Sequence, residues 1–429
     1  MHINSSMKIS SLLALFLLYM GISSFAASNM LMKNQEIRDG ETLVSPGERF
    51  VLGFFSPPKS TNRYVGIWYN KVSIQTVVWV ANRERPLIDS TGILTINDQG
   101  NLVIMEWRGG LTMIAYGSLS SNTSAELLEN GNLVLMNGNG GILWQSFDYP
   151  TDTFLPEMKA GRNLETKQNF LLTSWASESD PTPGVYTFGI DPNGTTKIFI
   201  WQRGTLYWTS GGFAVRNRSR FSSSLSQFNS LFYYTFVSNE KEQYYTYSFY
   251  NKSIISRIKL LHSGQFQQTM WSEDVQTWKV LWTVPSDRCD VYAPCGPYGS
   301  CNSNTISLCE CLQGFVPVSP RDWESSNWLD GCKRRTEITC GNEDAFLYFK
   351  TMRYPEHAEY VEGIGLIIEK CKSMCVNNCS CTAYASANVT ACLFWSGDLV
   401  GLRKNWNGTD LSDGGDIFIR VSASDLGIL

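Results

Sequence analysis

All the cysteines of this chain lie between Cys289 and Cys392. The 429-residue sequence has 12 of them, in two groups of six, and an even number in each group leaves no thiol over. The first group is Cys289, Cys295, Cys301, Cys309, Cys311 and Cys332, and the second is Cys340, Cys371, Cys375, Cys379, Cys381 and Cys392. We therefore expect a disulfide-held region that follows a cysteine-free body.

Two explanations fit such a cluster of cysteines. The first group lies among Gly, Pro and Asn with little apolar periodicity, which is typical of a small loop-rich module that disulfides hold together. The alternative is zinc, because the close pairs Cys309-Glu-Cys311 and Cys379-Ser-Cys381 offer thiolates that bind zinc well. Exported cysteines oxidise, so a secretion signal favours disulfides. Spacing alone does not select one of the many pairings that six cysteines allow.

The N-terminus has the pattern of a signal peptide over residues 1–26. Lys8 supplies the positive charge, Leu12 to Ile22 forms the apolar core, and Ser24-Phe-Ala26 fits a small-x-small cleavage site. The apolar run is shorter than the roughly 20 residues that span a bilayer, which argues against a membrane anchor. Met7 is an alternative start to Met1, because it would place Lys8 directly after the initiator.

Asn-x-Ser/Thr sequences recur along the rest of the chain. Such a sequence accepts a glycan only on an exposed asparagine of an exported protein, so their number predicts an extracellular glycoprotein. They begin at Asn122, Asn193, Asn217, Asn251, Asn378, Asn388 and Asn407.

The cysteine-free body consists of short apolar runs separated by Gly, Asn and Pro. Their length and their β-branched or aromatic content predict strands at 50–55, 64–68, 76–80, 102–105 and 133–136. Gly100-Asn-Leu-Val103 recurs as Gly131-Asn-Leu-Val134, 31 residues later. A period of this length indicates a repeat architecture, in which each unit buries its apolar face against the next.

Two motifs in the cysteine-rich region resemble a known family. Cys289-Asp-Val-Tyr-Ala-Pro-Cys295-Gly-Pro-Tyr-Gly-Ser-Cys301, followed by Cys309-Glu-Cys311-Leu-Gln-Gly-Phe-Val-Pro317, resembles the EGF-like segment of plant S-locus glycoproteins and S-domain (G-type lectin) receptor kinases. Cys371-Lys-Ser-Met-Cys375-Val-Asn-Asn-Cys379-Ser-Cys381, followed by Cys392-Leu-Phe-Trp395, resembles that family's PAN/apple domain. The resemblance covers nearly the whole chain beyond the signal.

This resemblance implies a mainly β fold, with two tandem β-prism lectin-like domains followed by a small disulfide-rich EGF-like module and an α+β PAN/apple domain. The implied ranges are 27–147 for a bulb-type lectin domain, 148–283 for the S-locus glycoprotein domain, 285–335 for the EGF-like module and 340–421 for the PAN/apple domain. The implied disulfides are Cys289–Cys301, Cys295–Cys309, Cys311–Cys332, Cys371–Cys392, Cys375–Cys381 and Cys340–Cys379.

A bulb-type lectin domain binds mannose at a Gln-x-Asp-x-Asn-x-Val-x-Tyr motif in each of its repeats. Two repeats of this chain align with that motif, at Asn97, Gln99, Asn101 and Val103, and at Asn130, Asn132 and Val134. Both lack the aspartate and the tyrosine, and a site with unmatched polar groups loses affinity steeply. We therefore favour Asn101 and Asn132 as turn or strand-end residues over mannose ligands.

A second candidate site lies between strands predicted at 197–201 and 232–237. It combines aromatic side chains with four arginines, namely Arg203, Tyr207, Trp208, Phe213, Arg216, Arg218 and Arg220. Tyr, Trp and Arg dominate protein–protein hot spots. In the self-incompatibility members of the family this neighbourhood is implicated in binding a small cysteine-rich peptide. The alternative is a solvated loop whose aromatic side chains pack locally.

The PAN segment contains the one predicted helix, over 362–375, where apolar and cysteine positions recur three to four residues apart. The EGF-like segment lacks the acidic signature of calcium-binding types. We expect no metal site and no cofactor.

No motif indicates catalysis. The sequence has no nucleophile elbow, His-Glu-x-x-His, P-loop or kinase Gly-rich loop with its lysine, and His262 and His357 stand far apart. The formal net charge of −4 gives no basis for a nucleic-acid partner, which would need clustered Lys and Arg. We predict that this chain is not an enzyme, although full-length family relatives are serine/threonine kinases.

Three hypotheses about function remain. The first is an extracellular recognition glycoprotein of the S-domain receptor class, which binds a peptide, protein or glycan ligand for cell-surface signalling or self/non-self recognition. The second is a mannose-binding lectin, and the third is part of a membrane receptor kinase. The expected partners are the extracellular ligand and either a second copy of the chain or a membrane receptor kinase. The expected location is the cell-wall space, or the plasma membrane if the full-length product continues into a transmembrane helix.

Overall fold

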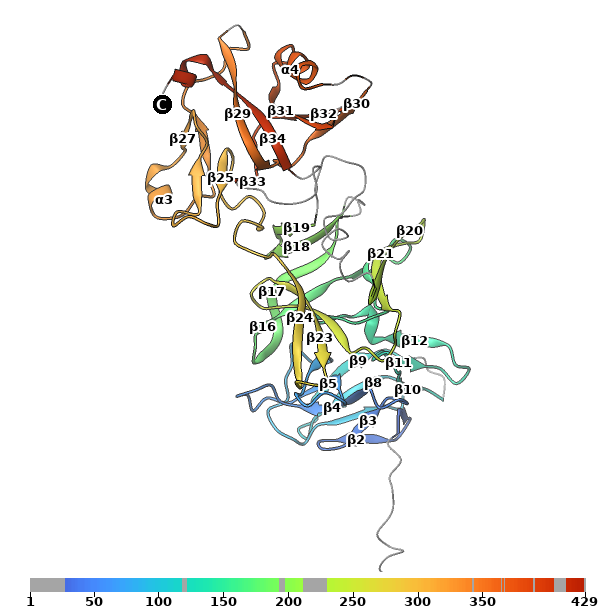
Figure 1. Cartoon of the computed structure of the whole chain (residues 1–429). Coiled ribbons are helices and arrows are strands. Elements are labelled where there is room, and N and C mark those ends of the chain that lie inside the picture. The colour runs from blue at the N-terminus through green and yellow to red at the C-terminus, as the bar shows by residue number, and fades with distance from the viewer. Residues whose placement is uncertain are drawn as a thin grey trace, which may run out of the picture. The chain divides into compact units, whose positions relative to one another are not determined.

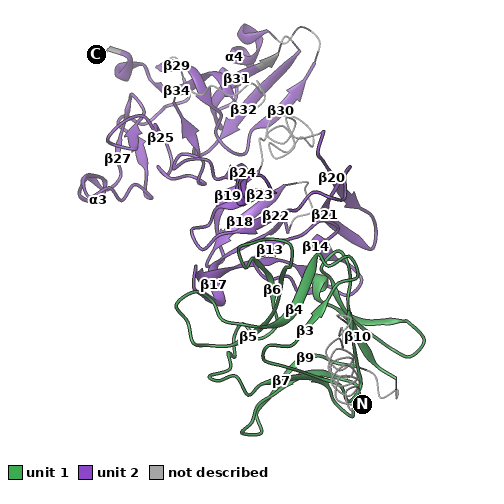
Figure 2. Ribbon diagram, turned by 60° about the horizontal axis from the view of Figure 1, so that its bottom comes forward, with its two compact units in different colours: residues 1–148 green, residues 149–429 purple. Residues whose placement is uncertain are grey.

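The computed structural model describes residues 28–117, 122–192, 197–210, 230–341, 343–363, 365, 367–388, 390–404 and 414–427. The predicted signal peptide therefore lies outside the described residues. The chain divides into two compact units, residues 1–148 and residues 149–429 (Figure 2). Both are built mainly of antiparallel strands, as the short β-branched and aromatic runs predict.

The first unit consists of three four-stranded antiparallel sheets (Figure 1). One contains β3 (Thr42–Val44), β4 (Phe50–Phe55), β5 (Tyr64–Tyr69) and β6 (Val77–Val80). The second contains β2 (Glu36–Arg38), β7 (Ile93–Ile96), β8 (Leu102–Met105) and β9 (Leu111–Ala115), and the third β1 (Met30–Met32), β10 (Ser124–Leu127), β11 (Leu133–Met136) and β12 (Ile142–Gln145). The first three strands each form the edge of a different sheet, so the N-terminal segment ties the three repeats together.

The core of the first unit explains the repeated sequence. Val103 and Val134 occupy equivalent places in β8 and β11, and both are almost completely buried. Gly100 and Gly131 precede them in tight turns at φ values of 82° and 89°, a backbone region that glycine adopts without strain. Each repeat therefore buries the same small set of side chains. The unit ends in a short 3₁₀ turn, η1 (Ser146–Asp148).

The second unit begins with three further four-stranded antiparallel sheets. One contains β13 (Thr153–Phe154), β22 (Ser256–Leu260), β23 (Phe266–Ser272) and β24 (Thr277–Val284). The second contains β15 (Asn169–Phe170), β14 (Ala160–Asn163), β21 (Glu242–Phe249) and β20 (Phe232–Ser238). The third contains β16 (Leu172–Ser177), β17 (Asp180–Ile190), β18 (Ile198–Gln202) and β19 (Thr205–Thr209). Two of these sheets repeat strand orders of the first unit, namely four consecutive strands and one early strand beside three consecutive ones, whereas the third has β14 between β15 and β21. Three four-stranded sheets in each part agree with the predicted tandem of lectin-like domains.

Aromatic side chains fill the core of this second lectin-like domain. The rings of Phe188 and Phe266 stack with centroids 3.8 Å apart. Gln268 is a polar side chain buried among them, and its amide oxygen accepts hydrogen bonds from Tyr234 Oη at 2.5 Å and Trp282 Nε1 at 2.6 Å. Burial raises the pKa of Tyr234 to about 12, so its hydroxyl stays a donor at physiological pH.

A buried ion pair fixes the start of the same domain. Asp152 is 1% exposed, and its carboxylate lies 3.1 Å from Lys259 Nζ in β22. The Lys259 ammonium also lies over the ring of Trp175, 4.7 Å from its centroid. Asp152 Oδ1 also accepts a hydrogen bond from Thr153 Oγ1 at 3.1 Å. The ammonium, this hydroxyl and the aromatic face together make the buried charge tolerable.

The cysteine-rich region forms one eight-stranded sheet, with a two-stranded sheet beside it (Figure 1). The large sheet has the order β26 (Cys309–Cys311), β25 (Gly299–Cys301), β33 (Leu402–Arg403), β29 (Asp344–Arg353), β34 (Gly414–Ser422), β31 (Cys381–Asn388), β32 (Ala391–Ser396) and β30 (Glu359–Glu362). The small sheet pairs β27 (Phe315–Pro317) with β28 (Cys332–Arg334), and the short helices are α3 (Pro320–Glu324) and η3 (Ala423–Gly427). Because β25 pairs with β33 in parallel, the EGF-like strands continue the PAN sheet.

The longer helix, α4 (Ile368–Val376), packs on the PAN strands β31 and β32 through Cys371 and Cys375. It begins at Ile368 and not at Glu362, where the sequence predicts its start. Glycine accounts for the difference, because Gly363 and Gly365 precede the helix and Gly365 adopts a φ of 73°, outside the right-handed helical region. The predicted position of the cysteines on the buried face is correct.

Candidate recognition sites

The first mannose-type motif forms a closed turn between β7 and β8. Asn97 Oδ1 accepts hydrogen bonds from the backbone N–H of Gln99 at 3.1 Å and of Asn101 at 3.0 Å. Asn101 is 8% exposed, donates from Nδ2 to Gln99 Oε1 at 3.3 Å, and accepts the N–H of Gly117 at 2.8 Å. The amide of Asn101 therefore connects the turn to the end of β9.

The second motif is more deeply buried. Asn132 is 5% exposed, and its Nδ2 donates to Gln145 Oε1 at 2.9 Å. Its Oδ1 accepts from Ser146 Oγ at 3.2 Å and from the N–H of Phe147 at 3.1 Å. Asn130 Oδ1 accepts the N–H of Asn132 at 3.1 Å. Both hydrogen-bonding ends of the Asn132 amide are thus used to hold β11 against the turn η1.

Only part of the predicted aromatic and arginine-rich loop is described. The prediction of a loop is wrong for residues 205–209, which form β19 and pair with β18 in a hairpin. Arg203 and Gly204 make the hairpin turn at φ values of 50° and 81°. The sequence reasoning missed this hairpin, although Gly204 between two aromatic runs is a recognised turn signal. Phe213, Arg216, Arg218 and Arg220 lie outside the described residues.

The two aromatic residues of β19 differ in accessibility. Trp208 is 6% exposed and belongs to the core, so it offers no surface to a partner. Tyr207 is half-buried, with its ring 5.0 Å from that of Tyr186 in an edge-on contact. Burial comes first among the causes that raise the pKa of Tyr207, followed by the neighbouring hydroxyl of Tyr186. Of the candidate residues that are described, Arg203 is the exposed one.

Six disulfides hold the cysteine-rich region. They join Cys289–Cys301, Cys295–Cys309, Cys311–Cys332, Cys340–Cys379, Cys371–Cys392 and Cys375–Cys381, which are the pairs that the resemblance implies. No free cysteine occurs in the structure. Across the parts of the chain that the structure describes, no group of three or more His, Cys, Asp or Glu residues could hold a metal ion.

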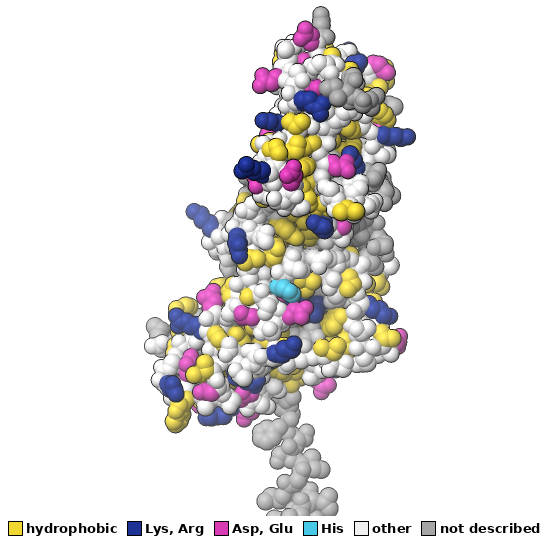
Figure 3. All heavy atoms as spheres, turned by 90° about the vertical axis from the view of Figure 1, so that its left-hand side faces the viewer, with side chains coloured by type: hydrophobic (Ala, Val, Ile, Leu, Met, Phe, Trp, Pro, Cys, Tyr) yellow, Lys and Arg dark blue, Asp and Glu magenta, His cyan; other side chains and the backbone are white. Residues whose placement is uncertain are grey.

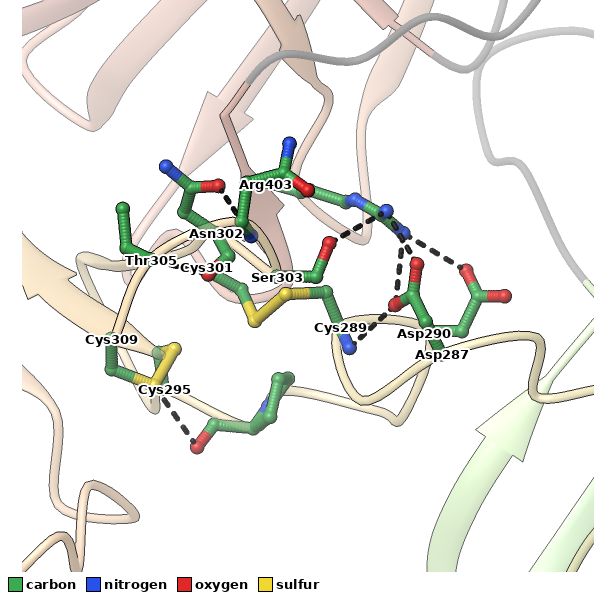
Figure 4. Close-up of a disulfide and its surroundings, with 12 residues drawn as sticks. Asp287, Cys289, Asp290, Cys295, Cys301, Asn302, Ser303, Thr305, Cys309 and Arg403 are labelled. Carbon is green, nitrogen blue, oxygen red and sulfur yellow. Dashed lines mark hydrogen bonds and ion pairs between the residues drawn. A yellow bond between two sulfur atoms is a disulfide. The ribbon is translucent and has the colours of Figure 1, made fainter. Parts of the chain in front are cut away.

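A charge network that the sequence reasoning missed surrounds the first disulfide (Figure 4). Arg403 lies 2.6 Å from the carboxylate of Asp287 and 3.5 Å from that of Asp290. Burial acts to raise the pKa of Asp290, but hydrogen bonds from Ser286 and the guanidinium groups of Arg353 and Arg403 hold it below its ordinary value. This network links the EGF-like segment to PAN residues more than a hundred positions away, so no local sequence signal could have revealed it.

Three of the predicted glycosylation sites are open to solvent. Asn122, Asn251 and Asn378 are exposed, and the last two accept hydrogen bonds from the Ser of their own Asn-x-Ser sequence. The side chain of Asn388 and the whole of Asn193, Asn217 and Asn407 lie outside the described residues.

Charge is dispersed on the face drawn in Figure 3, where Lys and Arg side chains are interspersed with Asp and Glu and form no basic stripe. A nucleic-acid site needs such a stripe. In the described part of the chain, no helix is long and apolar enough to cross a membrane.

Family profiles match three parts of the chain. The D-mannose binding lectin profile matches residues 76–176, the S-locus glycoprotein domain profile matches 208–319, and the PAN-like domain profile matches 340–402. The first match covers the end of the first unit and the start of the second lectin-like domain, the second covers the rest of that domain with part of the EGF-like segment, and the third lies in the PAN segment.

Relatives match almost the whole chain. S-locus-specific glycoprotein S6 of Brassica oleracea is 36% identical, and the alignment covers 99% of this chain and 98% of that protein. S-locus-specific glycoprotein BS29-2 of Brassica oleracea var. alboglabra is 37% identical, with 97% of each chain covered. The receptor-like serine/threonine-protein kinase SD1-8 of Arabidopsis thaliana is 37% identical over 96% of this chain and 49% of its own. The chain thus spans about half the length of that kinase and nearly all of the two glycoproteins, and it belongs to the S-locus glycoprotein family.

Proposed function

We propose that this chain is an extracellular recognition glycoprotein of the S-domain receptor class, and that it binds a peptide, protein or glycan ligand elsewhere than at the two mannose-type motifs. Family membership supports the recognition role. The use of Asn101 and Asn132 supports the second part. The two residues are 8% and 5% exposed, and their amides are hydrogen-bonded to neighbouring parts of the same unit.

This state of the amides matters because a mannose site works through polar groups that face the sugar hydroxyls. To reach a sugar, Asn132 would have to give up its bonds to Gln145, Ser146 and Phe147. Each buried group left without a partner costs about 1–3 kcal/mol. A monosaccharide, with few contacts to offer, would recover little of that.

The proposed role is non-catalytic. The kinase relative is matched over 49% of its length, whereas the S-locus-specific glycoproteins are matched over 97–98% of theirs. The proposed location is the extracellular space. The proposed partners are the ligand and either a second copy of the chain or a membrane receptor kinase, and light scattering on the secreted protein will distinguish monomer from homodimer.

A mannan-coated biosensor and a glycan array test the proposal directly. We expect the secreted protein to show no saturable binding to mannan or to mannose-terminated glycans. Asn101→Ala and Asn132→Ala are the test variants, and Asn137→Ala is the matched control, because Asn137 holds a similar turn outside the motif. Saturable mannose binding that Asn101→Ala or Asn132→Ala abolishes and Asn137→Ala retains would show that the motifs are working sugar sites.

A further inference from the structure

An open pocket of about 780 Å³ lies in the PAN part of the eight-stranded sheet, beside the start of α4. Its walls come from β29, β34, β31 and the first residue of α4. They include Tyr348, Thr351, Tyr354, Ile368, Asp416 and Phe418. The pocket is therefore mainly aromatic and aliphatic, with a single acidic side chain. It lies outside every site that the sequence indicates.

An irregularity in the sheet positions that acidic side chain. The register of β29 against β34 shifts between Phe349 and Met352, and within the bulge Thr351 adopts a φ of 50°. A left-handed conformation at a threonine is strained and is retained only where the surroundings require it. Here it turns the Thr351 N–H toward Asp416 Oδ1, at 3.3 Å, while Tyr348 Oη donates to Asp416 Oδ2 at 2.7 Å. Both carboxylate oxygens are thus held in place.

Within the described residues, the carboxylate of Asp416 has hydrogen-bond donors but no cationic partner. Among the described residues, no Lys or Arg forms an ion pair with Asp416, and no other lining residue carries a charge. Its field acts on the pocket, because the pKa of Tyr354 is raised to about 12 by burial first and by the charge of Asp416 second. The hydrogen bond to Asp416 likewise raises the pKa of Tyr348. Both hydroxyls stay protonated at neutral pH, so the pocket keeps one negative charge.

The aromatic walls complement a positive charge as well. The rings of Tyr348 and Phe418 lie 5.2 Å apart on neighbouring strands, and the buried Tyr354 also lines the pocket. Aromatic faces attract cations, most strongly where water is partly excluded. Ile368 and Phe418 provide the apolar surface against which a chain of methylene groups would pack.

We propose that this pocket binds a lysine side chain presented by a protein or peptide partner, with the ammonium on Asp416 and the methylene stem against Ile368 and Phe418. Each Asp416 oxygen already accepts one hydrogen bond, so the parallel two-bond approach of a guanidinium is hindered and a compact ammonium is preferred. An anionic group is repelled. The site is independent of the mannose-type motifs, and its test is separate from the glycan array.

The experiment uses the full secreted chain and Nα-acetyl-lysine N-methylamide as the probe, with Nα-acetyl-norleucine N-methylamide as its uncharged counterpart. Titration calorimetry or ligand-observed NMR measures the dissociation constants. We expect the lysine probe to bind at least about tenfold more tightly than the norleucine probe, which corresponds to about 1.4 kcal/mol. Asp416→Asn should weaken the lysine probe by about the same factor and leave the norleucine probe unchanged. The matched control is Glu359→Gln, which removes an exposed carboxylate on β30 outside the pocket.

The salt dependence of probe binding to the wild-type protein provides a second test, which needs no variant and so does not depend on whether a variant folds. Affinity for the lysine probe should fall as NaCl rises from about 0.05 to 0.5 M, because screening weakens a partly exposed ion pair, while affinity for the norleucine probe should not. An arginine probe that binds more tightly than the lysine probe would overturn the preference for an ammonium. Three results would overturn the proposal itself. They are equal affinity for the charged and uncharged probes, unchanged affinity of Asp416→Asn for the lysine probe, and no binding of the lysine probe up to about 10 mM.

Discussion

Replacement of Arg420 tests how the PAN helix is held. Arg420 is 2% exposed, and its guanidinium donates to the carbonyls of Val376 at 2.9 Å, Asn378 at 3.0 Å and Cys381 at 3.2 Å. Val376 is the last residue of α4, where backbone acceptors have no partner within the helix, and Asn378 lies two positions beyond it. Arg420 Nε also lies 3.5 Å from the carboxylate of Asp344, whose side chain is 3% exposed.

The magnitude follows from what Arg420→Met leaves behind. Val376 and Asn378 are exposed residues, so water can replace the guanidinium there, whereas the carbonyl of the buried Cys381 loses a donor. The buried carboxylate of Asp344 loses its paired guanidinium and keeps only the more distant charge of Arg334. Breaking a buried pair costs about 3–5 kcal/mol, and Arg334 places the expected loss toward the lower end. Arg420→Lys keeps the positive charge but lacks the several N–H donors of the guanidinium, so we expect a smaller loss of stability than in Arg420→Met. The double variant Asp344→Asn/Arg420→Met removes both charges. Its loss of stability should be smaller than the sum of the losses in the two single variants.

Hydrogen exchange read by mass spectrometry is the appropriate assay, because a chain of several domains has no single unfolding free energy. If the free energy of the opening that exposes α4 and β31 falls by about 3 kcal/mol, their amides exchange about a hundredfold faster. Peptides from β4 and β5 in the first unit are the internal control and should not change. Unchanged exchange in α4, or equal acceleration in β4 and β5, would refute the assignment of Arg420 as a local support of the helix.

Three further predictions concern other parts of the chain. Asn132→Ala should lower the stability of the first unit by about 1–3 kcal/mol, because Ser146 Oγ and the N–H of Phe147 lose their buried acceptor; differential scanning calorimetry beside Asn137→Ala measures this. The pKa of Asp290 is lowered in the fold, so its contribution to stability is complete above the ordinary value of 3.8 and is lost as the pH falls below it. Urea midpoints at pH 5 and pH 3 should therefore differ more in the wild type than in Asp290→Asn. Protein secreted from plant cells should lose glycan mass on deglycosylation, and peptide mapping should place one glycan at the exposed Asn122.

Local patterns in the sequence were enough to predict most strands. The apolar run at 50–55 forms β4 with the same bounds, because six consecutive apolar or small residues have no helical periodicity. The start of α4 and the hairpin at Arg203-Gly204 were missed, although glycines mark both places. At Gly204 and Gly365 a positive φ, which glycine adopts without strain, decides the local structure.

Contacts between distant residues could not be predicted from those patterns. The Arg403–Asp287 pair and the parallel pairing of β25 with β33 join segments about a hundred residues apart. Asp416 was not a candidate either, since an acid within an apolar strand is ordinarily a solvent-facing residue. Asp416 lies in a pocket because of the bulge at Thr351, and no sequence motif predicts that bulge.

The pairing of β25 with β33 also sets the units in which this protein can be recombined with its relatives. The boundary between Asp148 and Tyr149 separates two compact units, so a chimera joined there keeps every sheet intact. A junction between Arg335 and Cys340 would instead place strands from different parents side by side in one sheet, and would split the charge cluster around Arg403. The EGF-like and PAN segments are therefore inherited as one piece, and binding specificity that depends on either should transfer only when both are exchanged together.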